Sequence, residues 1–224
     1  MRPQVIAHRG ASGHAWQNSA TAFHQAVELG AEAVELDIHA TRDGVLLVHH
    51  DADVAGIGRI AELPVSAFSG FRLPDGGPIP TLAEALELCA GLDVWVEVKT
   101  LPPSGDRELF ATLDSGPNPR GYAVHSFDHR IIDRLGDARP ELRRGVLLAS
   151  YLLDTLPILR AVGADTLWMD TQLIDAELVR LLHDDGAQLI AWTANEPREI
   201  SRLLELGVDG ICGNYPDRVL QLRG

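Results

Sequence analysis

Positive charge is scarce in this chain. Its 224 residues include 19 lysines and arginines against 32 aspartates and glutamates, which gives a formal net charge of −13. A surface with that balance repels nucleic acids and anionic membranes, so we expect no nucleic-acid partner and no stable membrane association. An anionic small-molecule substrate is still possible, because a few cations inside a cleft can dominate the electrostatic potential within it.

Cysteines and long apolar runs are also scarce. Cys89 and Cys212 lie far apart in apolar contexts, which favours two buried thiols over a disulfide. The N-terminal stretch MRPQVIAHRG has no apolar segment long enough for a signal peptide or a membrane span. These features predict a cytoplasmic protein with reduced cysteines.

The chain instead holds a regular alternation of short β-branched runs and helical patterns. The predicted strands cover residues 4–9, 33–41, 45–50, 93–100, 121–127, 145–150, 166–171, 188–195 and 210–216. The predicted helices cover residues 19–30, 81–91, 106–116, 128–136, 152–163, 175–186, 197–207 and 217–224. Residues 33–41 and 45–50 count together as one long bent strand or as a strand and hairpin. The resulting eight strand–helix units predict an α/β fold, a (β/α)₈ TIM barrel that forms a single domain over residues 1–224. The active site of such a barrel lies at the C-terminal ends of its strands.

One segment interrupts this alternation after the second strand. Residues 52–80 are rich in glycine and proline and show no clear period. Because the segment follows the strand that ends near His50, we expect a small insertion that caps the catalytic face. A purely structural plug over the barrel mouth explains the composition equally well.

Polar residues occupy one face of two neighbouring strands. Glu35 and Asp37 alternate with aliphatic residues on one strand, and Glu97 and Lys99 alternate in the same way on the next. In a barrel, the aliphatic faces pack against the helices and the polar faces point inward. The three carboxylates are therefore expected to converge.

Three converging carboxylates repel one another unless protons or a cation resolve the repulsion. Oxygen ligands favour Mg²⁺ or Ca²⁺, so we predict a divalent-cation site at Glu35, Asp37 and Glu97. A rival interpretation pairs these acids with Arg9 and Lys99 in ordinary salt bridges. The two cations suit phosphate binding beside the metal.

His8 and His50 also follow apolar runs, at positions where they flank this cluster. One would act as a base or nucleophile and the other as the acid for the leaving group, in an order that the sequence leaves open. His49 is the neighbour of His50, and strand alternation sends only one of the two inward. The remaining histidines are assigned structural roles: His14, His24, His39, His125, His129 and His183.

Several motifs together resemble one enzyme family. They are HRGAS, GAEAVELDIHATRDGVLLVHHD, IPTLAEAL, VEVK, HSFD, AWTAN and GVDGICGNYPDRV. This set, which covers nearly the whole chain, resembles the glycerophosphodiester phosphodiesterases. The resemblance implies a TIM barrel with a small insertion and a metal-dependent hydrolysis of glycerophosphodiesters to glycerol 3-phosphate and an alcohol.

The resemblance also implies roles for single residues. Glu35, Asp37 and Glu97 match the family's metal ligands, and His8 and His50 match its catalytic pair. The family histidine directly precedes an aspartate, which selects His50 over His49. Arg9 and Lys99 match the phosphate-binding residues, and Trp192 matches an aromatic residue of the pocket wall.

The chain departs from the family pattern at two places. Residues 16–19 read WQNS where the family usually has PENT, so Gln17 replaces a glutamate, and DADVAGIG follows His50 in place of the family's LxRTT. Two alternatives therefore stay open. Apolar residues of the insertion (Val65, Phe68 and Phe71) suit a phospholipase D-like hydrolase of lysophospholipids, and Gln17 suits a non-catalytic phosphate-binding barrel.

Overall fold

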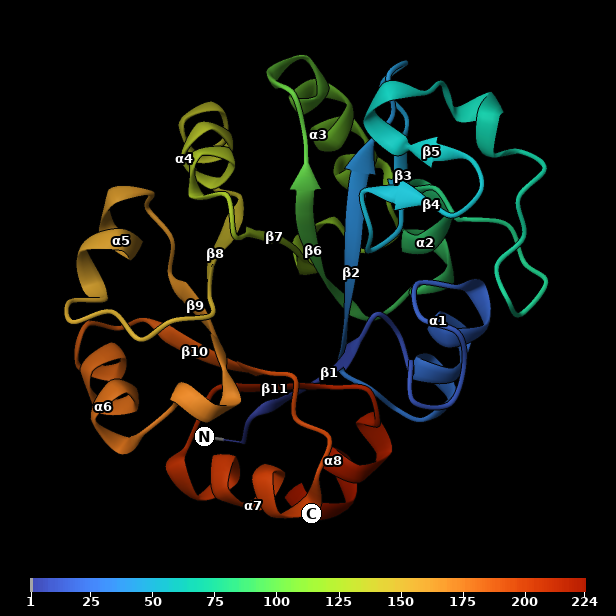
Figure 1. Ribbon diagram of the computed structural model, residues 1–224. Coiled ribbons are helices and arrows are strands. Elements are labelled where there is room, and N and C mark those ends of the chain that lie inside the picture. Colours follow the sequence, from blue (N-terminus) through green and yellow to red (C-terminus); the bar gives the residue numbers. More distant parts are fainter. Residues whose placement is uncertain (1) are drawn as a thin grey trace.

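The strands of the computed structural model, which describes residues 2–224, form a closed parallel barrel (Figure 1). Each strand pairs with the next along the chain, and β1 pairs with both β11 and β2, which closes the ring. The eight barrel strands are β1 (Gln4–His8), β2 (Ala33–Ala40), β6 (Asp93–Thr100), β7 (Tyr122–Ser126), β8 (Arg143–Leu148), β9 (Thr166–Asp170), β10 (Gln188–Trp192) and β11 (Gly210–Gly213). The predicted (β/α)₈ TIM barrel is confirmed.

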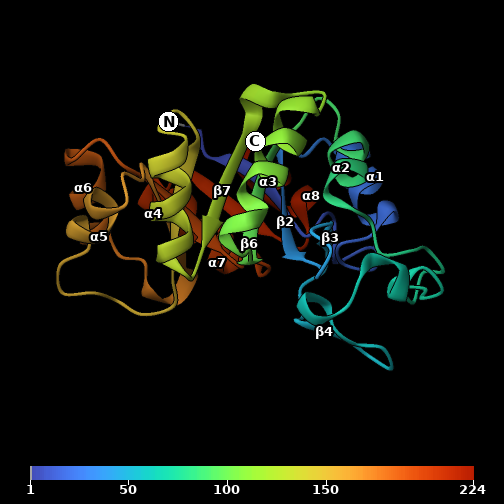
Figure 2. The ribbon, with the colours of Figure 1, turned by 90° about the horizontal axis from the view of Figure 1, so that it is seen from above.

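Helices surround the ring of strands (Figures 1 and 2). They are α1 (Ala20–Glu28), α2 (Leu82–Leu88), α3 (Asp106–Ser115), α4 (His129–Ala138), α5 (Leu156–Ala161), α6 (Ala176–Asp184), α7 (Pro197–Leu206) and α8 (Pro216–Arg223). Local signals set their ends. Ser19 caps α1, and Thr81 and Glu84 form a capping box at the start of α2, in which each side chain accepts from the other's backbone N–H.

The alternation of side chains along each strand divides the core into two layers. Val34, Leu36 and Ile38 of β2 are fully buried in the layer between strands and helices. A smaller cluster fills the inside of the barrel: Ile6, Ala33, Trp95, Ala123, Leu147, Trp168, Ile190 and Cys212. This inner cluster forms the floor beneath the polar residues at the C-terminal ends of the strands.

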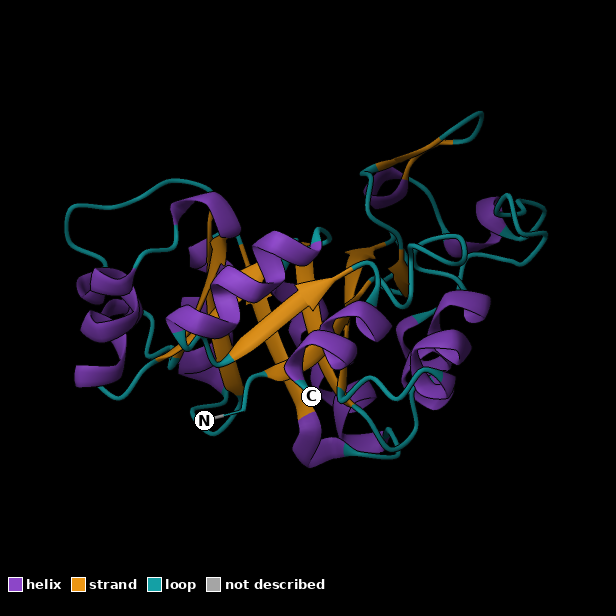
Figure 3. Ribbon diagram, turned by 90° about the horizontal axis from the view of Figure 1, so that it is seen from below, coloured by secondary structure: helices purple, strands orange, loops and turns teal. Residues whose placement is uncertain are grey.

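The segment after β2 leaves the barrel. It begins with β3 (Leu46–Val48), which pairs antiparallel with β2 and is shorter than the predicted strand, so that His49 and His50 lie beyond its end. The chain then forms a hairpin of β4 (Asp53–Val54) and β5 (Gly58–Arg59), followed by two short 3₁₀ helices over Ile60–Glu62 and Val65–Phe68. Figure 3 shows this hairpin projecting beyond the end of the barrel at which the strand arrows point.

The insertion has a hydrophobic cluster of its own. Phe68 is buried in this cluster, and Val65 and Phe71 pack against it. Of the three apolar side chains that suggested a lipid substrate, Phe68 therefore fills the insertion itself, whereas Val65 and Phe71 stay partly exposed.

Both cysteines are buried free thiols, as expected. Within residues 2–224, no helix combines the length and the apolar character needed to cross a membrane.

Candidate active site

Three carboxylates meet inside the barrel near the C-terminal ends of two neighbouring strands. Glu35 and Asp37 come from β2 and Glu97 from β6, and the strand register places Asp37 opposite Glu97. Their residues are at most 6% exposed. One oxygen from each carboxylate lies within 4.8 Å of the other two. The predicted convergence of these acids is therefore present.

Two cations contact the same cluster. Nε of Arg9 lies 3.1 Å from Oδ2 of Asp37, and Nζ of Lys99 lies 3.1 Å from Oδ1 of Asp37 and 2.6 Å from Oε1 of Glu97. The salt bridges of the rival interpretation thus exist. They do not balance the site, because the three carboxylates, when ionised, outnumber the two permanent cations that contact them among residues 2–224.

The pKa shifts of the three carboxyl groups reflect their burial and the electrostatic repulsion among them. Burial, together with Asp37 and Glu97, raises the pKa of Glu35 well above its ordinary value. Burial and Asp37 raise the pKa of Glu97 to about 7. Burial also opposes the charged form of Asp37, but Lys99 and Arg9 outweigh it and lower the pKa of this carboxyl to about 2. A divalent cation would relieve the repulsion that raises the two glutamate pKa values.

His8 lies at the C-terminal end of β1. Its Nδ1 donates to Oδ1 of Asn214 at 2.7 Å, and its Nε2 lies 3.9 Å from Oε2 of Glu35. Burial and the charge of Arg9 lower the pKa of His8 to about 4. The ring is therefore neutral at pH 7, and the bond to Asn214 leaves the lone pair on Nε2, which can accept a proton.

His50 lies in the loop after β3 and is more open, with 35% of its side chain exposed. Its Nδ1 donates to Oδ1 of Asp51 at 2.8 Å. Burial lowers the pKa of His50, and Asp37 and Asp51 act in the opposite direction. The adjacent His49 donates from Nδ1 to the backbone oxygen of Asp51 and lies outside the pocket lining.

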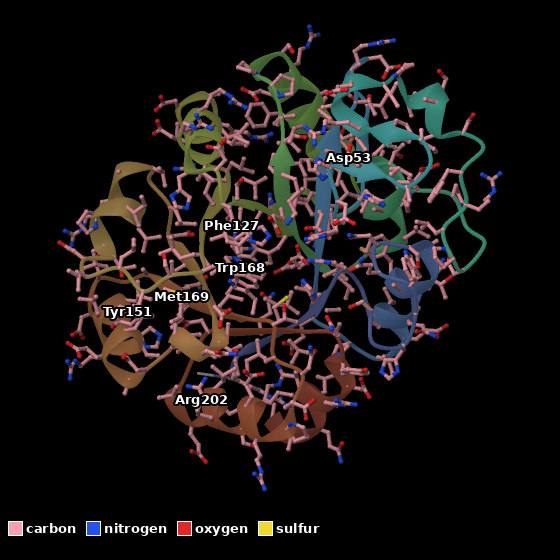
Figure 4. All side chains as sticks on the ribbon, in the orientation of Figure 1. Asp53, Phe127, Tyr151, Trp168, Met169 and Arg202 are labelled. Atoms are coloured by element: carbon pink, nitrogen blue, oxygen red, sulfur yellow. The ribbon has the colours of Figure 1, made fainter. Side chains whose placement is uncertain are left out.

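A single pocket connects these groups. Trp192 forms part of its wall and packs edge-to-face against Phe127, with ring centroids 5.6 Å apart. Figure 4 shows Phe127 and Trp168 within the ring of strands. Seven of the predicted site residues line the pocket: His8, Arg9, Glu35, His50, Glu97, Lys99 and Trp192. The eighth, Asp37, is fully buried and contacts the two cations.

Asn18 and Asn214, which sequence patterns did not single out, and Gln17 support these groups. Asn18 donates to Oδ2 of Asp37 at 2.8 Å, and Asn214 holds His8. Gln17, the residue that departs from the family pattern, accepts from Nη1 of Arg9 at 2.6 Å. The Asn18–Asp37 and His8–Asn214 contacts join residues that are 19 and 206 positions apart in the sequence. No periodic pattern in the sequence indicates such contacts.

His125 also belongs to the pocket, although the sequence assigned it a structural role. It lies on β7, is 1% exposed, and pairs in register with Glu97 of β6. Burial lowers the pKa of His125 well below its ordinary value. Alternation along the strand 121–127 could have found this residue, because it places Ala123 and His125 on the inner face.

Comparisons with known proteins agree with this geometry. The sequence model of the glycerophosphoryl diester phosphodiesterase family matches residues 8–218. A glycerophosphodiester phosphodiesterase of Caldanaerobacter subterraneus is 30% identical, over 99% of this chain and 98% of the relative.

Solved structures share the fold at lower identity. A glycerophosphodiester phosphodiesterase from Parabacteroides distasonis matches with a TM-score of 0.90 at 22% identity, over 99% of this chain and 97% of that one. A phosphodiesterase from Oleispira antarctica, in complex with the product sn-glycerol-3-phosphate, matches with a TM-score of 0.88 at 24% identity, over 98% of this chain and 96% of that one.

Proposed function

The chain belongs to the glycerophosphoryl diester phosphodiesterase family, and we propose that its barrel pocket performs the hydrolysis of glycerophosphodiesters to glycerol 3-phosphate and an alcohol. One observation carries this proposal. A single pocket brings together a buried cluster of carboxylates, two phosphate-binding cations and two histidines. Each of these three kinds of group has a part in phosphodiester hydrolysis.

Glu35, Asp37 and Glu97 would hold a divalent cation. They fit this role because they offer only oxygen ligands within 4.8 Å of one another, and because their charge exceeds that of the neighbouring cations. Such ligands suit Mg²⁺ and Ca²⁺, and both are candidates. When bound, the cation supplies positive charge that stabilises the phosphate in the transition state.

Arg9 and Lys99 would bind the non-bridging oxygens of the phosphate. Gln17 accepts from Nη1 of the Arg9 guanidinium, and Asp37 lies 3.1 Å from its Nε. Lys99 lies between Asp37 and Glu97 as a compact charge. Trp192 would form the wall against which the substrate packs.

The two histidines would share the acid and base roles, and their surroundings support one assignment of these roles. His8, held through Nδ1 by Asn214, has Nε2 free to accept the proton of the attacking oxygen, or to attack directly. The attacking oxygen belongs to water or to a hydroxyl group of the substrate. After attack by a substrate hydroxyl or by His8 itself, water would hydrolyse the resulting cyclic phosphate or phosphohistidine and give glycerol 3-phosphate. His50 has the carboxylate of Asp51 beside its Nδ1, which opposes the lowering of its pKa by burial, and it would protonate the leaving alcohol.

Residues 52–80 would cap the mouth of the pocket within the single domain of residues 1–224. The surface charge and the reduced cysteines favour a cytoplasmic location. The lysophospholipid alternative loses part of its support, because Phe68 lies inside the insertion's own cluster, whereas Val65 and Phe71 are only partly buried against it. The non-catalytic alternative predicts binding without turnover.

Release of glycerol 3-phosphate from a panel of glycerophosphodiesters, with and without a chelator, tests the proposal. We expect cation-dependent release and lower activity on a lysophospholipid. Faster release of choline from a lysophospholipid would favour the lipid alternative, and tight binding of a glycerophosphodiester without turnover would favour the binding protein.

A further inference from the structure

His125 is a buried polar ring without a hydrogen-bond partner. Neither Nδ1 nor Nε2 has one among residues 2–224, although the residue is 1% exposed. Its ring lies beside two indoles, with its centroid 5.7 Å from that of Trp95 and 4.2 Å from that of Trp168. A buried imidazole without partners costs free energy that an aliphatic side chain in the same space would not.

The packing around His125 does not require a polar side chain at this position. The inner cluster around it consists mainly of alanine, leucine, isoleucine and tryptophan side chains. Gly145, its register partner on β8, leaves room for this arrangement, because a Cβ there would lie 3.2 Å from that of His125. Polar side chains kept in such a position at a cost to stability are typical of functional sites.

One charged group lies within reach of the ring. Nε2 of His125 is 3.8 Å from Oε1 of Glu35, slightly beyond hydrogen-bond distance. The other oxygen of Glu35 accepts from the backbone N–H of Arg9 at 3.2 Å. Glu35 is thus approached by Arg9 at one oxygen and by His125 at the other.

We propose that His125 is a positioning residue for Glu35, and that it tunes the affinity of the carboxylate cluster for a divalent cation. Whatever its charge, an imidazole carries at least one N–H, and a modest rotation of the Glu35 carboxylate would close the gap to a hydrogen bond. Residues that orient a metal ligand in this way typically change metal affinity or activity by about 10–100-fold when they are replaced. The inference rests on the proposed function, since it requires that Glu35 hold a cation.

His125→Leu and His125→Gln test the inference in the full-length, metal-depleted protein. Calorimetric titration with Mg²⁺ and with Ca²⁺ measures affinity, and thermal unfolding without cation measures stability. We expect His125→Leu to bind about 10–100-fold more weakly while its cation-free melting temperature is equal to or above that of the wild type. His125→Gln keeps an N–H donor and should bind within a few-fold of the wild type. The matched control is His24→Leu, at an exposed position on α1.

Two results would overturn the inference: wild-type affinity in His125→Leu, or equal weakening in the leucine and glutamine variants. Should His125→Leu not fold, His125→Met, which also lacks an N–H but is more flexible, takes its place in the comparison. Failure of the proposed function is distinguishable, because it would show as a wild-type protein that binds no cation or needs none for turnover.

Discussion

At the scale of single residues, His8 and His50 differ in the partner that each Nδ1 contacts. An amide oxygen holds His8, whereas a carboxylate holds His50. Replacing either by alanine should lower kcat by about 10²–10⁴-fold, the usual contribution of general acid or base catalysis. Steady-state assays of His8→Ala and His50→Ala measure this loss. His183→Ala, which removes only a surface contact to Asp209, should keep normal kcat. Near-normal turnover in either active-site variant would disprove the assigned roles.

Lys99 is the only lysine of the chain. Its ammonium both contacts two carboxylates of the cluster and faces the pocket, so its removal should have two effects of opposite sign. In Lys99→Met, KM should rise at least about tenfold because a charged contact to the phosphate is lost. Cation affinity should rise, because a competing positive charge has gone. Steady-state kinetics measure KM, and calorimetry measures the cation affinity. A fall in both KM and cation affinity would contradict the placement of Lys99.

At the scale of elements, local chemistry sets helix ends independently of the site. Thr81→Ala removes the hydroxyl that accepts from the backbone N–H of Glu84 at the start of α2. We expect a loss of about 1 kcal/mol in the free energy of unfolding, measured by urea denaturation, with unchanged kcat. Thr81→Ser keeps the cap and should differ little from the wild type. Equal stability of the alanine variant would show that tertiary packing alone holds α2.

Elements with a clear period were predictable from sequence, and contacts between distant elements were not. The barrel strands and the alternation that turns Glu35 and Glu97 inward follow from patterns within eight or fewer residues. The shortness of β3 and the cluster inside the insertion depend on packing that no period records. The approach of His125 to Glu35 likewise arises only when the strands align, and the structural role assigned to His125 from the sequence stays a prediction.

At the scale of the whole molecule, hydrogen bonds link α8, near the end of the chain, to residues that precede β1 and β2. Arg223 of α8 donates from Nη1 and Nη2 to the two oxygens of Glu32, at 2.6 and 2.8 Å, and from Nη1 to the backbone oxygen of Pro3. The hydrogen bonds from Arg223 lower the pKa of Glu32 below its ordinary value of 4.5. A lowered carboxyl pKa stabilises the fold above pH 4.5, and this contribution is lost as the pH falls through the folded-state pKa.

Arg223→Met should therefore destabilise the protein in a pH-dependent way. We expect a loss of about 1 kcal/mol at pH 7, at the low end for charged hydrogen bonds because the Glu32 side chain is 44% exposed. The difference from the wild type should shrink as the pH falls below 4.5. Urea unfolding over a pH series measures it, and a difference that is constant with pH would show that the contact to Glu32 is not its source.

The most direct test of the central claim is a cation titration of turnover. Metal-depleted protein is mixed with a glycerophosphodiester, and release of glycerol 3-phosphate is followed as Mg²⁺ or Ca²⁺ is added, for the wild type and for Glu97→Gln. The account predicts no release from the depleted wild type, recovery with one of the cations, and a much weaker response in the variant. Full-rate release by the depleted wild type would contradict it.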